Sequence, residues 1–243
     1  AHLLTRVCWI SSLPKDEING VVIGNEVLDV LPVKLFEIAQ GDVLERCVSW
    51  QDERFYWHPR LADEVLQKSI LELDVDFSDG YQSEINPSLG PWVKSVTASL
   101  QRGLILLIDY GYPRQEYYHP QRTKGSLLCH YRHRAHPDPF VFPGLQDITA
   151  HVDFTAVAEA AVDSGLHVAG YNTQGQFLLC CGIDDLAQRM EQGDDAYRMS
   201  MSQQIKRLSL PSEMGEIFKV IALTRGIDEP LLGFSMFDLR GKL

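Results

Sequence analysis

The sequence has 243 residues, of which 45% are hydrophobic, so it is long enough to bury a substantial core. It carries 22 Lys and Arg against 33 Asp and Glu, and this net charge of −11 argues against nucleic acid or anionic membrane surfaces as partners. No apolar run approaches the roughly 18 residues of a membrane-spanning helix, and no signal-peptide or transit-peptide pattern is visible.

Short apolar runs indicate the strands of the first half of the chain. Residues 20–24 and 103–109 are rich in Val, Ile and Leu, which is typical of strands buried on both faces of a parallel sheet. An earlier strand is expected over residues 6–10. Asn25 and Glu26 follow one run and Asp109 ends the other. In open α/β sheets ligands bind beyond the carboxyl ends of the strands, so these polar residues are site candidates.

The segment between these strands has a different pattern. Segments in which apolar and polar residues alternate, separated by short polar turns, predict a three-stranded antiparallel meander. Its strands are residues 33–38, 43–50 and 54–58. A helix with 3.6-residue periodicity is expected over 61–73. We therefore expect an inserted subdomain over residues 33–85 on an α/β core formed by residues 1–32 and 86–243.

Helices and strands alternate in the second half, which predicts a mostly parallel α/β sheet. Residues 112–143 are rich in His and Pro and are expected to be mainly loop. Asp153 is a candidate N-cap of a helix that stops at Gly165. The expected helices are residues 91–100, 153–164, 176–192 and 202–208, and the expected strands are residues 167–172 and 218–224.

Two carboxylates, Glu26 and Asp29, lie three residues apart just after the first buried strand. If a helical turn begins there, both face the crevice, and such a pair suits the planar guanidinium of an arginine. The alternative is a helix N-terminus whose acids favour the helix dipole, and spacing alone favours this alternative. A metal site has weaker support because no His or Cys lies nearby.

Three further groups are ambiguous from the sequence alone. Asp109 is either a site carboxylate or part of a strand-ending turn with Gly111 at positive φ. Glu84 is a third acid for the same crevice, or an exposed one. His151 suits a base that titrates near neutral pH, although a His beside a helix start is more often a cap or a surface residue. The irregularly spaced His residues of the 112–143 segment form no zinc pattern.

Taken in order, the segments resemble the MidA-like family of S-adenosylmethionine-dependent methyltransferases, which includes a mitochondrial assembly factor for respiratory complex I. The resemblance runs from about residue 6 to residue 243. The matching segments are NEVLDVLPV at 25–33, SEINP at 83–87, LIDYG at 107–111, GSL at 125–127, DITAHVDF at 147–154, TQ at 173–174 and MGEIFK at 214–219.

This resemblance implies a class I (Rossmann-like) methyltransferase fold with strand order 3-2-1-4-5-7-6, in which strand seven is antiparallel. It also implies S-adenosyl-L-methionine as cofactor and a protein arginine as substrate. Glu26 and Asp29 would hold the guanidinium, and His151 would accept the proton. The expected cofactor contacts are Asn25 and Asp109, the expected substrate contacts are Glu84, Tyr110 and Asp147, and no metal is expected.

One departure from the family pattern is clear. A class I methyltransferase needs a Gly-rich turn after its first strand, and this sequence contains no G-x-G. The sheet is therefore expected to be N-terminally incomplete in this chain. The chain would then lack the cofactor half of the fold, and we expect it to be inactive alone. The strand over 20–24 would then be an apolar edge. Either the missing half lies outside these 243 residues, or the strands rearrange, or two chains complement each other as a homodimer.

Two other functions stay open beside the arginine methyltransferase. The chain fits a non-catalytic assembly or binding factor that keeps the fold, and a small-molecule methyltransferase is a third possibility. Five scattered Cys without a C-x-x-C favour reduced thiols. The expected compartment is the cytoplasm for a bacterial protein, or the mitochondrial matrix for a eukaryotic one.

Overall fold

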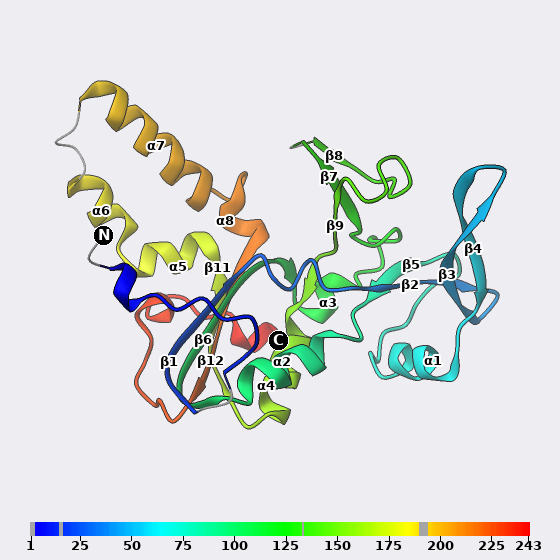
Figure 1. The fold of residues 1–243 in the computed structure, drawn as a ribbon, viewed down its shortest axis with the longest axis horizontal. Coiled ribbons are helices and arrows are strands. Elements are labelled where there is room, and N and C mark those ends of the chain that lie inside the picture. Colours follow the sequence, from blue (N-terminus) through cyan, green and yellow to red (C-terminus); the bar gives the residue numbers. More distant parts are fainter. Residues whose placement is uncertain (1–2, 15–16, 133, 190–193) are drawn as a thin grey trace.

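The computed structural model describes residues 3–14, 17–132, 134–189 and 194–243 (Figure 1). Its main sheet has the strand order β1-β6-β12-β11, with β10 paired to the end of β6. The strands are β1 (Ile18–Asn25), β6 (Leu100–Tyr112), β10 (Val152–Asp153), β11 (His167–Thr173) and β12 (Phe218–Arg225). β1 and β10 run parallel to β6, whereas β12 runs antiparallel to both β6 and β11.

In this sheet β1, β6, β10 and β11 run in one direction and β12 runs against them, so the prediction of a mostly parallel sheet is confirmed for the described strands. The order β1-β6-β12-β11 reproduces the 4-5-7-6 half of the expected class I order, with the antiparallel strand in the expected place. The predicted fold class is therefore confirmed for this half of the sheet. Strands one to three have no counterpart among the described residues.

Helices cover both faces of the main sheet (Figure 1). On one face, α2 (Leu89–Thr97) and α4 (Phe154–Asp163) pack through residues such as Val93 and Phe154 onto Ile105 and Ile221. The side chain of Asp153 accepts hydrogen bonds from the first turn of α4, which confirms the predicted N-cap. On the other face, Phe234 of η3 (Leu232–Phe234) and residues of α5 (Gln174–Cys180) cover β12.

Residues 33–85 contain a second sheet with the order β4-β3-β2-β5. Its strands are β2 (Lys34–Ala39), β3 (Asp42–Gln51), β4 (Arg54–Leu61) and β5 (Gln82–Ile85). The predicted meander is thus confirmed, with β5 added. α1 (Glu64–Leu71) is shorter than expected because Leu61 belongs to β4. The core of this sheet, around Phe36 and Tyr81, also takes in Tyr117 and Tyr118, so the boundary at 33–85 stays a proposal.

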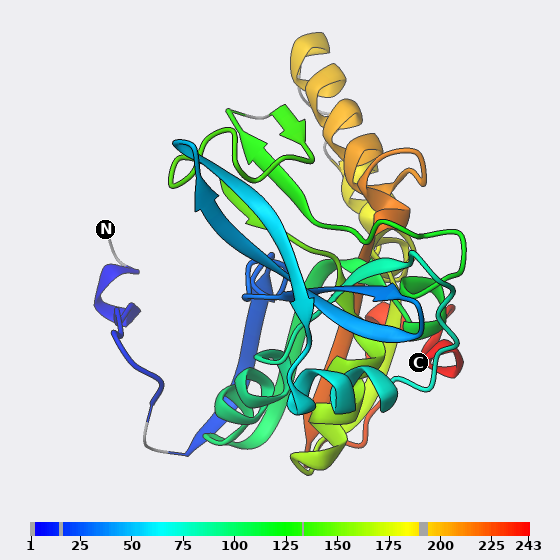
Figure 2. The same cartoon turned by 90° about the vertical axis from the view of Figure 1, so that its right-hand side faces the viewer.

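A third, small sheet has the order β8-β7-β9, and two of its strands, β7 and β8, lie within the segment 112–143 that was expected to be mainly loop. Its strands are β7 (Leu128–Tyr131), β8 (Arg134–His136) and β9 (Asp147–Thr149), and α3 (Arg114–Tyr117) precedes them. Strands of three or four residues carry too little alternation to stand out in a sequence rich in His and Pro. Figure 2 shows the β3–β4 hairpin rising beside this sheet.

The strand predicted over 20–24 is confirmed by β1, but two other expectations were wrong: a strand over 6–10, and burial of β1 on both faces. Residues 6–10 form no strand, and the described N-terminal segment contains only η1 (Leu4–Arg6), which stands away from the body of the molecule in Figure 2. β1 is buried on one face only, because Val21 and Ile23 are 62% and 66% exposed. β1 is the outer strand of the described sheet, so its second face has no helix over it in this part of the chain.

The last segment is more helical than predicted. The helix expected over 176–192 is split into α5 and α6 (Ile183–Arg189) at Gly182, which has φ +79°. Residues 190–192 of that prediction lie outside the described residues. The expected helix over 202–208 is part of the longer α7 (Asp195–Ser209), followed by α8 (Met214–Ile217), and η4 (Arg240–Lys242) ends the chain. No helix in the described ranges is both long and apolar enough to span a bilayer.

Candidate functional site

Asp109 stabilises the turn that follows β1. It is fully buried in β6, and its Oδ2 accepts hydrogen bonds from the backbone N–H groups of Val27 (3.1 Å), Leu28 (2.9 Å) and Asp29 (3.3 Å). Its Oδ1 accepts from the backbone N–H of Tyr110 at 3.0 Å. Burial, reinforced by the nearby Asp29 carboxylate, raises the pKa of Asp109 to about 7. The carboxyl group therefore acts as the anchor of residues 27–29.

Glu26 begins this turn in a strained conformation. Its φ is +52°, a left-handed value that costs a non-glycine residue about 1–3 kcal/mol. Its backbone N–H donates to the carbonyl of Ile108 at 2.9 Å, which holds the residue against β6. Its side chain is exposed, and Oε1 accepts a 3.1 Å hydrogen bond from the amide of Asn25. Asn25 and Glu26 thus present polar groups to solvent at the carboxyl end of β1.

Asp29 has a different environment. It is only 4% exposed, and its Oδ2 accepts a hydrogen bond from the Tyr110 hydroxyl. Its Oδ1 is buried and has no hydrogen-bond partner among the described residues. Residues 26–29 form a bend and turn instead of a helix. The expectation that a helical turn brings Glu26 and Asp29 together as one crevice-facing pair is therefore wrong.

Glu84 is buried, contrary to the exposed alternative. It lies in β5 with 1% exposure, and its Oε1 accepts from the Tyr117 hydroxyl at 2.8 Å and from the backbone N–H and hydroxyl of Ser126. Burial raises the pKa of Glu84. The Ser126 hydroxyl oxygen also accepts from the backbone N–H of His151 at 2.9 Å. Glu84 thereby fixes the segment that precedes β10, although no sequence pattern linked it to Tyr117 or Ser126.

The ring of His151 lies against Tyr110 and Tyr112, with both ring centroids 5.3 Å from its own. Its Nδ1 is buried without a hydrogen-bond partner among the described residues. Burial, together with the positive charges of Arg122 and Lys219, lowers the pKa of His151 to about 4. His151 is therefore neutral near pH 7. It can accept a proton, but only as a weak base.

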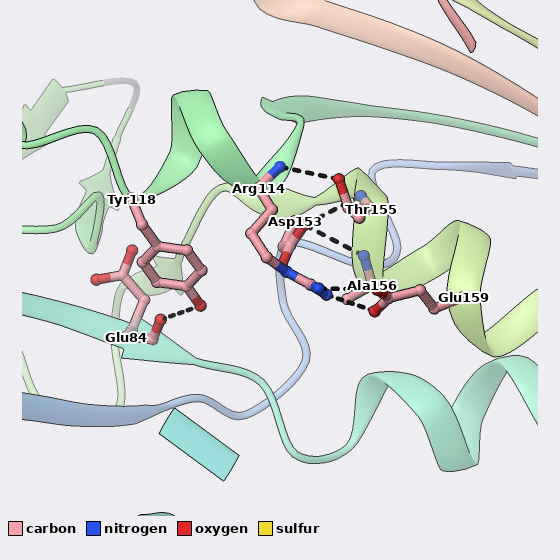
Figure 3. A network of polar contacts seen from close by, with 7 residues as sticks. All are labelled: Glu84, Arg114, Tyr118, Asp153, Thr155, Ala156 and Glu159. Carbon is pink, nitrogen blue, oxygen red and sulfur yellow. Dashed lines mark hydrogen bonds and ion pairs between the residues drawn. The ribbon is translucent and has the colours of Figure 1, made fainter. Parts of the chain in front are cut away.

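A polar network borders the cavity that Glu84 and His151 share (Figure 3). Arg114 reaches from α3 to the helix α4, where it pairs with Asp153 at 3.2 Å and with both carboxylate oxygens of Glu159. The Tyr118 hydroxyl donates to the backbone carbonyl of Glu84 at 3.2 Å. The cavity has a volume of about 290 Å³. Arg114 lies in a segment without any motif, so no sequence pattern predicts its role.

The predicted site residues thus fall in four places. Asn25 and Glu26 are exposed at the end of β1, while the buried Asp29 and Asp109 form a cluster with the partly buried Tyr110. Glu84 and His151 line the 290 Å³ cavity, and Asp147 is exposed on β9. The structure also shows Gly111 inside β6 and not in a positive-φ turn. A Cβ there would lie 2.1 Å from the carbonyl oxygen of Val152, so glycine permits β10 to pair with β6.

Comparison with known proteins identifies the family. The family described as "Putative S-adenosyl-L-methionine-dependent methyltransferase" matches residues 1–172. The chain belongs to this family.

Relatives of known name support this assignment. The chain is 28% identical over 226 residues to the mitochondrial "Protein arginine methyltransferase NDUFAF7 homolog" of Caenorhabditis elegans, covering 90% of this chain and 50% of the relative. It is 27% identical over 231 residues to the mitochondrial "Protein arginine methyltransferase NDUFAF7" of Danio rerio, covering 89% and 50%. The chain therefore spans about half the length of these curated relatives.

Solved structures confirm the predicted fold. A likely methyl transferase from Burkholderia thailandensis, crystallised with S-adenosyl-homocysteine, is 43% identical, with a TM-score of 0.95 over 100% of this chain and 62% of that one. A native crystal structure of an uncharacterised protein from the same organism gives 43% identity and a TM-score of 0.93 over 98% and 64%. The family resemblance inferred from the sequence motifs is thus confirmed.

Proposed function

We propose that the protein is an S-adenosylmethionine-dependent methyltransferase that methylates an arginine side chain of a protein partner. The observation that carries the methyltransferase assignment is the match over the whole chain to a structure bound to S-adenosyl-homocysteine. The arginine substrate is supported by the names of the mitochondrial relatives at 27–28% identity. The compartment follows the source: the bacterial cytoplasm, or the mitochondrion as for those relatives.

The end of β1 fits a polar cofactor. Asn25 offers an exposed amide at the carboxyl end of the strand, where open α/β sheets bind ligands, beside the Glu26 carboxylate that we assign to the substrate. Asp109 was predicted as a second cofactor contact, but both of its oxygens are occupied by backbone N–H groups. We propose instead that Asp109 positions the turn, so that Glu26 and Asp29 keep their places.

S-adenosylmethionine brings an already activated methyl group, so the chain has to supply alignment and electrostatics. The exposed Glu26 carboxylate would accept hydrogen bonds from a guanidinium and hold one nitrogen in line. His151 is neutral at pH 7 and stays our candidate for accepting the proton that leaves the nitrogen. Glu84 has its carboxylate bonded to Tyr117 and Ser126, so we propose a positioning role for it.

The test uses the longest polypeptide that the gene encodes, incubated with methyl-labelled S-adenosylmethionine and a lysate of cells that lack the gene. We expect label in methylarginine after hydrolysis of the protein fraction. Label only in small molecules would favour the small-molecule methyltransferase, and label on another amino acid would contradict the arginine substrate.

A non-catalytic binding or assembly factor is the second candidate, since the sequence of this chain contains no G-x-G turn. Calorimetric titration of the same polypeptide with S-adenosylmethionine separates the two functions. Heat of binding and a thermal shift support the enzyme. Neither signal, together with retained capture of a partner protein, supports the binding factor.

A further inference from the structure

A groove lined in part by Asp29 shares no lining residue with the Glu84 cavity. It is bounded by the turn after β1, by the β3–β4 hairpin and by the segment that leads into β9, and has a volume of about 470 Å³. This volume lies within the roughly 300–1,000 Å³ typical of ligand pockets. The side chains that matter for the argument are Asp29, Arg46, Phe55, Trp57, Phe140 and Ile148.

The outer wall of the groove is aromatic. The rings of Trp57 and Phe140 have centroids 4.8 Å apart, and Phe55 lies 6.1 Å from Phe140. Phe55 and Ile148 are 39% and 44% exposed, so this apolar wall is open to solvent. The guanidinium of Arg46 stacks 4.8 Å from the Trp57 ring and donates to Gln82, so one positive charge of the chain lies against this aromatic wall.

The inner end of the groove carries the buried carboxylate of Asp29. Its Oδ1 lacks a partner among the described residues, and a buried, unsatisfied polar atom is costly unless a ligand completes it. Lys34, which also lines the groove, is already paired with Glu45 at 3.2 Å and Asp63 at 3.6 Å. An acceptor with a negative charge is therefore left for a cationic donor from outside.

The groove combines a carboxylate at its floor with an aromatic wall at its mouth. Resting on the proposed function, we propose that it docks the substrate polypeptide: a cationic side chain reaches Asp29, and the neighbouring aromatic side chain packs on Phe55, Trp57 and Phe140. Adjacent side chains of a fully extended chain point to opposite faces, so we propose that the chain bends between the cationic and the aromatic residue, and the open mouth lets it continue. Aromatic and arginine side chains are also the commonest anchors of protein interfaces.

The probes are three capped dipeptides, titrated calorimetrically into the longest polypeptide that the gene encodes. N-acetyl-Phe-Arg-amide should bind. N-acetyl-Phe-citrulline-amide, which has nearly the same shape without the charge, should bind at least about tenfold more weakly. N-acetyl-Gly-Arg-amide, which lacks the ring, should also bind about tenfold more weakly. Equal affinity for Phe-Arg and Phe-citrulline, or no saturable binding of Phe-Arg at millimolar concentration, overturns the proposal.

Variants assign the two halves of the groove. Asp29→Asn should erase the preference for arginine over citrulline, and Phe140→Ala should erase the preference for Phe over Gly. Leu145→Ala is the matched control, since Leu145 is 71% exposed near Phe140 but does not line the groove. If Asp29→Asn does not fold, the comparison of Phe140→Ala with Leu145→Ala still tests the proposal. Equal weakening of N-acetyl-Phe-Arg-amide binding by both variants overturns it.

The outcomes also separate the groove from the proposed function. Peptide discrimination without any methyl transfer would overturn the function and leave the docking groove. Methyl transfer to protein that is undiminished in Phe140→Ala would overturn the docking proposal and leave the proposed function intact. Concentration-dependent dimerisation that Phe140→Ala abolishes, with no dipeptide binding, would show that a second copy of the chain occupies the surface instead.

Discussion

Replacing Asp109 by Asn removes an ionisable group from the anchor of the β1 turn and should change how stability depends on pH. Burial and the nearby Asp29 raise the pKa of Asp109 from 3.8 to about 7, so the folded protein holds a proton that the unfolded chain releases. This contribution to stability is complete below about pH 4 and is lost as the pH rises through 7. The rise in pKa corresponds to about 4 kcal/mol, or roughly 1.4 kcal/mol per pH unit in that window.

Urea unfolding of wild type and Asp109→Asn at several pH values between 5 and 8 measures this effect. The free energy of unfolding of the wild type, minus that of the variant, should fall with pH, and other titrating groups such as His151 cancel in the difference. Asp147→Asn is the control, because Asp147 is exposed on β9, and its difference should stay within about 0.5 kcal/mol. A difference that is flat or rises with pH would show that the four backbone donors keep Asp109 ionised, and the reasoning would fail.

Two further predictions concern the residues around the Glu84 cavity. Gly125→Ala should destabilise by about 2–4 kcal/mol, because Gly125 has φ +69° and a Cβ would lie 2.1 Å from Oε2 of Glu84. Gly144→Ala, at φ +80° in open space, should cost only the backbone strain, and equal losses in thermal unfolding would refute the steric argument. Asp153→Ala should cost more than Asp63→Ala. Both residues cap a helix, which contributes about 1 kcal/mol, but Asp153 also forms a partly buried ion pair with Arg114, whereas the ion pair of Asp63 with Lys34 is exposed. Denaturant unfolding that ranks Asp63→Ala as equal or worse would contradict this.

The elements that were predicted well are those with strong local patterns. The apolar runs of β6 and β12 carry their own evidence of burial, and Asp153 stands directly before the helix that it caps. β1 shows the limit of the same reasoning. Its run is as apolar as that of β6, but Val21 and Ile23 are exposed, because burial depends on which strands and helices lie beside it.

Sequence reasoning singled out residues of the candidate site but did not predict how they are arranged. The acids at 26, 29, 84 and 109 were all singled out, yet the structure leaves Glu26 exposed, buries Asp29 beside Asp109 and places Glu84 at a different cavity. Asp109 meets the 27–29 turn about 80 positions earlier in the chain, and Glu84 meets Ser126 across 42 positions. Such partners are set by the tertiary fold, and no spacing rule in a single sequence encodes them.

The effect of Glu26→Gln on methyl transfer tests the central claim most directly. The longest polypeptide that the gene encodes is assayed for label transfer to protein arginine, with Glu53→Gln as control, because Glu53 is likewise exposed at positive φ, +58°, in the β3–β4 turn. The account predicts that Glu26→Gln lowers turnover by about 10²–10³-fold and keeps the affinity for S-adenosyl-homocysteine. It predicts that Glu53→Gln changes neither quantity. Unchanged turnover in Glu26→Gln would contradict the assignment of this carboxylate to the guanidinium.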